Sequence, residues 1–181
     1  MSRSHSHALA LRLLPALLAS TVALLATRGA QAKSGIAIGA DLDYTDAVEE
    51  AAVGGGSGFN VRLGYKLDLV GIQLTPELGG AYHGFSGDRG AKFSQGIVGA
   101  RLSFLKVLEP GIYAHLGYGH LAVADRDGRS GATADAGVTL DLTMLPLVDV
   151  GVHGGYNGML KSGDYPAFDS YVVGIHGALI F

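Results

Sequence analysis

The sequence contains no cysteine, and beyond its first 32 residues it has no apolar run long enough for a membrane-spanning helix. Without cysteine, neither a disulfide framework nor a thiolate metal site is available. A spanning helix needs roughly 18 or more consecutive apolar residues, so this class of membrane protein is excluded for the remainder of the chain. Hydrophobic residues nevertheless make up 48% of the sequence. Apolar content without apolar runs indicates alternation of apolar and polar residues.

Basic residues are also scarce. The chain has 13 Lys and Arg against 16 Asp and Glu, and three of the basic residues (Arg3, Arg12 and Arg28) lie in the first 32 positions. Residues 33–181 therefore carry ten basic and sixteen acidic side chains, a net charge of −6. This balance disfavours nucleic acid as a partner, because nucleic-acid-binding proteins carry a basic footprint.

The first 32 residues have the pattern of a secretory signal. Arg3 and Arg12 precede an apolar run at 13–26, and Ala-Gln-Ala at 30–32 is a small-x-small cleavage site. An N-terminal membrane anchor fits less well, because the run is short and is interrupted by proline and polar residues. The predicted organisation is a signal peptide at 1–32 and one domain at 33–181.

Apolar and polar residues alternate in eight separate segments of the predicted domain. Strict period-two alternation is typical of strands with two different faces. Eight strands of about ten residues suit a domain of 149 residues, whereas a 16-stranded porin needs about twice that length. The predicted strands lie at 35–45, 58–68, about 71–83, about 95–104, 112–119, 135–142, 148–157 and 170–181.

The positions of the aromatic residues distinguish a membrane barrel from a soluble sandwich. A sandwich places large aromatics in the middle of its apolar face, whereas a lipid-facing barrel carries two aromatic girdles around an aliphatic band. Here the aromatics fall on the apolar faces near the strand ends. The predicted girdles are Tyr44, Phe59, Tyr82, Tyr118, Tyr156 and Tyr171 at one end and Tyr65, Phe104 and Phe181 at the other.

The connections alternate between long and short. Long polar segments at 46–57, 86–94, 122–132 and 158–169 alternate with short ones near 69–70, 105–110 and 145–147. This predicts an all-β, eight-stranded antiparallel up-and-down transmembrane β-barrel, closed because lipid tolerates no unpaired edge. Pro76 interrupts the third strand, so we expect a bulge or a break there.

The chain resembles the small eight-stranded outer-membrane barrels of the OmpA/OmpX type. The resemblance rests on the strand and turn pattern, on repeated Gly-Tyr pairs such as those at 64–65, 117–118 and 155–156, and on the last strand. It implies a location in the outer membrane of a Gram-negative cell envelope. In that family the assembly machinery reads a final aromatic preceded by apolar residues at every second position. The resemblance assigns this role to Tyr171, Val173, Ile175, Leu179 and Phe181.

The inward faces carry many ionisable residues among glycines. Eight strands leave an interior just wide enough for side chains, so enclosed charges must pair or hydrate. We expect Arg62 and Glu77 directly opposite each other if the turn is centred near Leu69 and Val70. A closed ionic plug is favoured over a thin water path or a ligand pocket. The predicted lumen network is Asp41, Asp43, Arg62, Lys66, Glu77, Arg101, His115, Asp135, Asp141, His153 and His176.

Histidines and serines give little sign of catalysis or metal binding. His83, His115, His153 and His176 are predicted to point inward but lie on separate strands, without a close metal-binding spacing. A lumenal zinc or copper site remains an alternative. Lipid A deacylases are barrels of similar size that use His, Ser and Glu, but no histidine of the predicted domain has Ser or Thr two positions later. We predict no catalytic residue, no metal and no cofactor.

The sequence predicts an integral outer-membrane barrel with a structural or surface-interaction role, with its long loops as contact sites. A narrow pore or small-ligand transporter is the first alternative, and a lipid acyl-hydrolase is the second. The predicted partners are outer-membrane lipid, lipopolysaccharide and the barrel-assembly machinery. The barrel is expected to be a monomer.

Overall fold

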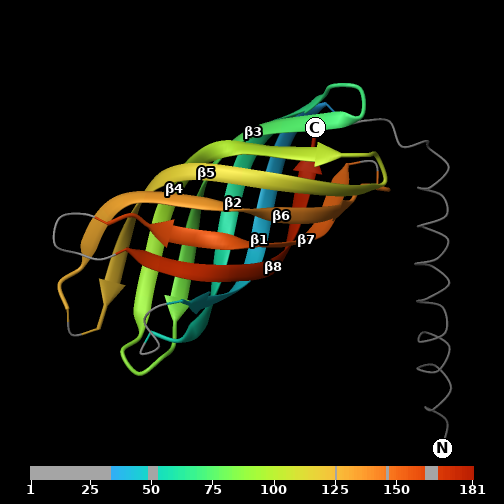
Figure 1. Ribbon diagram of the computed structural model, residues 1–181. Helices are drawn as coiled ribbons and strands as arrows, with labels where there is room; N and C mark the ends of the chain where they lie inside the picture. The colour runs from blue at the N-terminus through green and yellow to red at the C-terminus, as the bar shows by residue number, and fades with distance from the viewer. Residues whose placement is uncertain (1–33, 49–52, 125, 146, 162–166) are drawn as a thin grey trace, which may run out of the picture.

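The computed structural model describes residues 34–48, 53–124, 126–145, 147–161 and 167–181. Neighbouring strands pair antiparallel throughout, and the last strand pairs with the first to close a barrel. The predicted all-β, eight-stranded antiparallel barrel is confirmed, while the predicted signal peptide lies outside the described residues (Figure 1). The strands are β1 (Gly35–Ala47), β2 (Gly55–Asp68), β3 (Ile72–Phe85), β4 (Ala91–Phe104), β5 (Leu108–Val123), β6 (Arg129–Leu142), β7 (Val148–Met159) and β8 (Phe168–Ile180).

The two faces of the wall differ as the alternation requires. In β1, Asp41 and Asp43 are buried while Leu42, between them, is 64% exposed. Aliphatic side chains on other strands are exposed in the same way, including Val98 and Leu116. Soluble monomers rarely expose contiguous apolar surface beyond a few hundred Å². An apolar outer wall with a polar interior is instead the pattern of a barrel surrounded by lipid.

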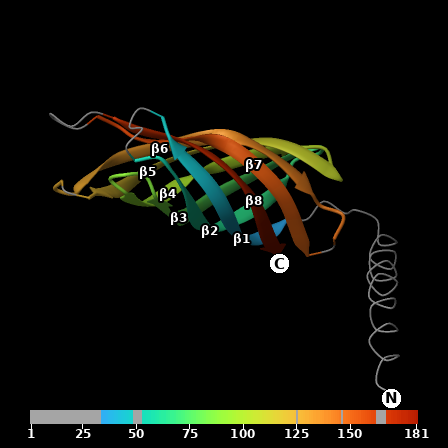
Figure 2. The same ribbon diagram turned by 90° about the horizontal axis from the view of Figure 1, so that it is seen from below.

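The two ends of the barrel have different connections. The three short turns, 69–71, 105–107 and 143–147, lie at the same end as the C-terminus, at the upper right in Figure 1. The four other connections lie at the opposite end, and the same separation is visible from below in Figure 2. We call these the turn end and the loop end. The loop-end connections are 48–54, 86–90, 124–128 and 160–167.

The loops are shorter than the sequence predicted, because the strands extend further toward the loop end. Pairing continues to Gly55 opposite Asp46 and to Ala91 opposite Val123. Backbone hydrogen bonding does not stop where the apolar alternation stops, since glycine and polar residues donate and accept equally well. At the turn end, residues 108–110 belong to β5 and not to a turn.

Pro76 causes neither the predicted bulge nor a strand break. Gly64 pairs with Glu77 and Leu67 pairs with Leu74 in one unchanged register, so no extra residue is inserted. Pro76 itself pairs with Ala100 on the β4 side. The ladder therefore loses pairs only toward β2, as expected for a residue without a backbone N–H.

The hairpin turn between β2 and β3 places a valine, Val70, in a backbone conformation that is unfavourable for it. Val70 and Gly71 are its two central residues, with φ of 56° and 90°, and the backbone N–H of Leu69 donates to the carbonyl of Ile72 at 2.8 Å. Two central residues with positive φ define a type I′ turn, which favours Asn-Gly. A β-branched residue is strained in this conformation.

Candidate functional site

A buried arginine occupies the middle of the lumen. The Arg62 guanidinium donates from Nε to Asp41 at 3.0 Å, from Nη2 to Asp41 at 2.6 Å and from Nη1 to Glu77 at 2.8 Å. All three side chains are buried. A guanidinium presents a planar fork of donors that fits a carboxylate through two parallel bonds. The pairs join β1, β2 and β3 across the interior of the barrel.

The expected placement of Arg62 directly opposite Glu77 is wrong. Arg62 is opposite Gly79, and Glu77 is opposite Gly64, so the two ionic residues are diagonal neighbours. The turn is centred on Val70 and Gly71, which moves the register by two residues from the one assumed. The ion pair still forms because a long arginine side chain spans a diagonal between strands.

His115 links this arginine cluster to β6. Its Nε2 lies 2.8 Å from Glu77 Oε1, and its Nδ1 lies 2.6 Å from Asp135 Oδ1. An ionised carboxylate only accepts hydrogen bonds, whereas a neutral imidazole has one donor and one acceptor nitrogen. Two carboxylate partners therefore require both ring nitrogens to donate, so His115 is the imidazolium cation.

A pair of neighbouring histidines lies on β7 and β8. His153 Nε2 is 2.9 Å from Asp43 Oδ1, His176 Nε2 contacts Asp141 Oδ1, and the two Nδ1 atoms are 3.2 Å apart. A hydrogen bond between the two Nδ1 atoms needs one of them to donate and the other to accept. Arg101 lies beside this group, with Nη1 3.7 Å from Asp141.

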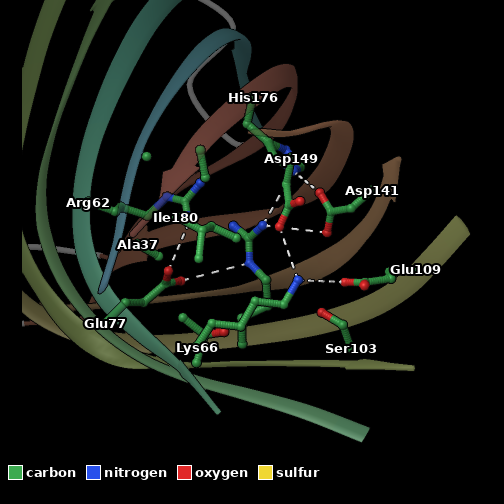
Figure 3. Close-up of a pocket in the computed structure, with 14 residues that line it drawn as sticks. Ala37, Arg62, Lys66, Glu77, Ser103, Glu109, Asp141, Asp149, His176 and Ile180 are labelled. Carbon is green, nitrogen blue, oxygen red and sulfur yellow. Dashed lines mark hydrogen bonds and ion pairs between the residues drawn. The ribbon is translucent and has the colours of Figure 1, made fainter. Parts of the chain in front are cut away.

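A lysine fills the lumen near the turn end. Lys66 Nζ donates to Glu109 at 2.9 Å and to Asp149 at 3.0 Å, as Figure 3 shows. The predicted network contained neither carboxylate. Glu109 fell in the predicted connection at 105–110, whereas β5 already begins at Leu108 and Pro110 pairs with Leu140. Asp149 lies on the inward face of the alternation in β7, and this position could have assigned it to the lumen network.

The lumen contains more acids than permanent cations. Each residue of the predicted network has a hydrogen bond or an ion pair with a lumenal partner. Because both ring nitrogens of His115 donate to carboxylates, this histidine supplies part of the missing positive charge. The described lumen contains Asp41, Asp43, Glu77, Glu109, Asp135, Asp141 and Asp149, the cations Arg62, Lys66 and Arg101, and His83, His115, His153 and His176.

The loop-end half of the lumen is mainly apolar, although Thr45, Thr133 and Ser170 are also buried there. Phe93 is fully buried and packs against Phe168, with ring centroids 6.0 Å apart. The ring of His83 stacks on Phe93 at 6.4 Å and marks the border with the ionic half. The sequence reading missed this cluster because it placed most of these residues in loops. The loop-end cluster consists of Val53, Phe85, Ala91, Phe93, Leu121, Met159 and Phe168.

The free space inside the barrel is small and divided. One cavity of about 40 Å³ lies toward the turn end beside Lys66 and Glu109, and a second of about 40 Å³ lies beside Asp43 and His115. Arg62 and Arg101 line both cavities, so these two side chains lie between them. Cavities of this size hold water, whereas small-molecule sites need several hundred Å³.

The described residues contain no group of three or more His, Asp or Glu side chains arranged to hold a metal ion. The four inward histidines bond to carboxylates or to each other, or stack on phenylalanine. The arrangement can neutralise buried charge and fix eight strands to one another. It leaves no room in which an organic substrate would meet these groups.

The aromatic residues of the predicted girdles all point outward. Their exposed fractions run from 37% for Tyr82 to 67% for Phe181. Phe59 and Tyr82 contact each other on neighbouring strands, as do Tyr156 and Tyr171. The residues of the predicted assembly signal, Tyr171, Val173, Ile175, Leu179 and Phe181, lie on the same outer face. Their role in assembly stays a prediction.

The closed eight-stranded wall, apolar outside and ionic inside, defines the fold of small outer-membrane β-barrels. Among solved structures, the chain is similar to Neisserial surface protein A (NspA), with a TM-score of 0.62, 15% identity, and coverage of 83% of this chain and 100% of that one.

Two further structures share the fold. The outer membrane enzyme PagL has a TM-score of 0.52, 16% identity and coverage of 80% and 99%. The N-terminal β-barrel domain of Pseudomonas aeruginosa OprF has a TM-score of 0.51, 12% identity and coverage of 82% and 100%. No family model and no curated protein sequence matches the chain. At these identities the likeness establishes the fold.

Proposed function

We propose that this protein is an outer-membrane barrel with a structural and surface-interaction role, exported by its N-terminal signal and closed to solutes. The observation that carries the proposal is the filled lumen: ion pairs around Arg62 and Lys66 in one half and the cluster around Phe93 in the other. A closed interior leaves the lipid-facing wall and the loop end as the surfaces where partners bind. The likeness to a bacterial surface protein, NspA, supports the same reading.

Recognition of external partners takes place at the loop end. Loops on a rigid scaffold are where binding residues concentrate. Arg89 and Lys92 lie exposed on or next to the 86–90 connection, and Asp88 beside them is exposed as well. Ladder pairs continue to the strand residues that flank a loop, such as Ala91 with Phe85. The barrel therefore fixes the positions of the two ends of that loop.

The test is to replace each loop-end connection separately with a two-residue Asn-Gly turn. Heat-modifiable migration on gels measures barrel folding, and binding of intact cells to immobilised host-surface and bacterial-surface components measures function. We expect all four variants to fold and at least one to lose binding. Full binding by every variant, or recovery of the protein as a soluble periplasmic monomer, contradicts the proposal.

The proposal includes no catalytic site. His120 and Ser130 do contact each other on the outer wall, with Nδ1 and Oγ 2.9 Å apart. Activation of a serine also requires a group that orients the histidine. Among the contacts of the described residues, His120 has no carboxylate partner. A lipid acyl-hydrolase activity that Ser130→Ala abolishes would overturn this part of the proposal.

A further inference from the structure

The outer wall has a polar groove at one place above the aromatic girdle. Ser94 on β4, His120 on β5 and Ser130 on β6 are direct neighbours in the ladder, and all three point outward. His120 Nδ1 and Ser130 Oγ are 2.9 Å apart. These residues line a shallow hollow of about 250 Å³ that is open to the outside of the wall.

An outward-facing glycine makes the groove hollow. Gly96 is two residues from Ser94 on the outward face of β4, and a Cβ added there would meet no atom within 4 Å. The space in front of Gly96 is therefore open to a ligand from the membrane side. Tyr118 pairs with Gly96 and lines the same groove, which provides an aromatic wall.

The groove lies at the depth of the lipid headgroups. His120 is two residues beyond the girdle residue Tyr118 toward the loop end, and Ser94 is two residues beyond Gly96. Two residues of a strand tilted by about 40° rise roughly 5 Å along the membrane normal. An aromatic girdle marks the membrane interface, so groups 5 Å beyond it meet headgroups and not acyl chains.

Charge differs between the two sides of the barrel at this height. Exposed Lys92 is the next outward residue of β4 beyond Ser94 toward the loop end, and His120 adds an exposed imidazole. On the opposite side, the outward positions next to the loops are Asp46 on β1 and Asp169 on β8. An anionic headgroup is therefore attracted to the β4–β6 side and repelled from the β8–β1 side.

We propose that this groove binds the phosphorylated saccharide headgroup of an outer-leaflet glycolipid of the lipopolysaccharide type. His120 and Lys92 meet the phosphate, Ser94 and Ser130 bond to sugar hydroxyls, and Tyr118 packs on the sugar ring. Two hydroxyls and an aromatic face suit a phosphorylated sugar better than a glycerol phosphodiester, which lacks a ring. The inference rests on the proposed membrane location and names one lipid partner of that barrel.

The chain contains no tryptophan, so single tryptophans can report on each side of the barrel. Leu116 lies two residues below Tyr118 on β5 and is 67% exposed, and Leu42 lies two residues below Tyr44 on β1 and is 64% exposed. Leu116→Trp and Leu42→Trp form a matched pair of reporters. In bilayers of dibrominated phosphatidylcholine both are quenched, and a lipid that displaces the brominated lipid restores fluorescence.

Purified rough-type lipopolysaccharide, the same lipid after dephosphorylation, and phosphatidylglycerol are titrated in turn. We expect lipopolysaccharide to restore Leu116→Trp fluorescence with saturation, dephosphorylation to weaken this about tenfold, and Leu42→Trp to show no saturable response. The double variant His120→Ala, Ser130→Ala should also bind about tenfold more weakly.

Gly96→Leu should fill the groove and abolish the response. Gly154→Leu is its control, because Gly154 faces outward on β7 and an added Cβ there meets its nearest atom at 3.8 Å. Equal responses from the two reporters, an equal effect of phosphatidylglycerol, or undiminished binding by Gly96→Leu would each overturn the inference. A barrel that inserts without lipid preference leaves the proposed function standing, whereas failure to insert contradicts the proposed function itself.

Discussion

The two halves of the lumen are filled by different interactions, ion pairs toward the turn end and apolar packing toward the loop end. Toward the turn end, Arg62 and Lys66 hold carboxylates from several strands through hydrogen-bonded ion pairs. Toward the loop end, Phe93 and Phe168 fill the interior with rings. Ion pairs fix which strands meet but require every charge to be matched, whereas apolar packing excludes water without that requirement. The comparison indicates that the ionic half is sensitive to charge and the apolar half to volume.

Removing the central arginine should have the largest effect. Arg62→Met leaves Asp41 buried without its cation and removes one of the cations of Glu77, which keeps His115 and Arg101. This should cost about 4 kcal/mol in the free energy of unfolding, measured by urea in lipid vesicles. Adding Asp41→Asn and Glu77→Gln should restore much of that loss. Lys106→Met, at an exposed turn residue, is the control and should change little. Unchanged stability of Arg62→Met would show that the ion pairs do not hold the lumen.

Emptying the apolar half should cost somewhat less. Phe93 is 0% exposed, and Phe93→Ala should lower the unfolding free energy by about 3 kcal/mol through lost burial and a cavity. Phe93→Leu keeps most of the volume and should lose less than half of that. The same urea titration measures both. Equal losses for Ala and Leu would contradict closure by volume.

Alkaline pH should weaken the ionic half by a smaller amount. His115 holds a proton between Glu77 and Asp135, so its stabilisation is present in mild acid and is lost as the pH rises and the proton leaves. We expect a fall of about 1–2 kcal/mol between pH 6 and pH 9. Unfolding measured across this range in lipopolysaccharide-free vesicles gives the profile.

Three variants sharpen the pH comparison. His115→Gln should flatten the profile, while His120→Gln, an exposed histidine on the outer wall, should leave it unchanged. Phe93→Ala should lower stability equally at every pH, because its contacts are apolar. A profile that His120→Gln flattens as much as His115→Gln would place the titration outside the lumen.

The smallest effect is expected at a turn that belongs to neither half. Val70→Asn relieves a β-branched residue at positive φ and creates the Asn-Gly pair that a type I′ turn favours. A gain of about 1 kcal/mol is expected in the same unfolding titration. A loss of stability would show that the turn is not type I′.

Much of this fold could be predicted from the sequence, because alternation of side chains is a local property. The inward parity of Asp41 on β1 and the outward parity of Tyr118 on β5 follow directly from period two. Strand ends did not follow from it. Residues 91–94 pair in a ladder with the usual polarity reversed, because Ala91 and Phe93 face inward while Lys92 and Ser94 face outward.

The partners inside the lumen could be predicted less well than the strands. Which carboxylate meets Arg62 depends on register, and register depends on the exact turn residues at Val70 and Gly71. Lys66 reaches Glu109 and Asp149 across the barrel, a contact that no pattern within one strand contains. The Ser130 and His120 contact likewise needs the register of β5 and β6 before it can be found.

Conductance of the wild-type barrel in planar lipid bilayers tests closure of the lumen most directly. Arg62 and Arg101 lie between the two water-sized cavities and the Phe93 cluster fills the loop end, so insertion of the folded protein should produce no steady channel current. The combined variant Arg62→Ala, Phe93→Ala serves as the positive control and should conduct. A stable, ion-selective current through the wild type would contradict the closed lumen and favour the narrow-pore alternative.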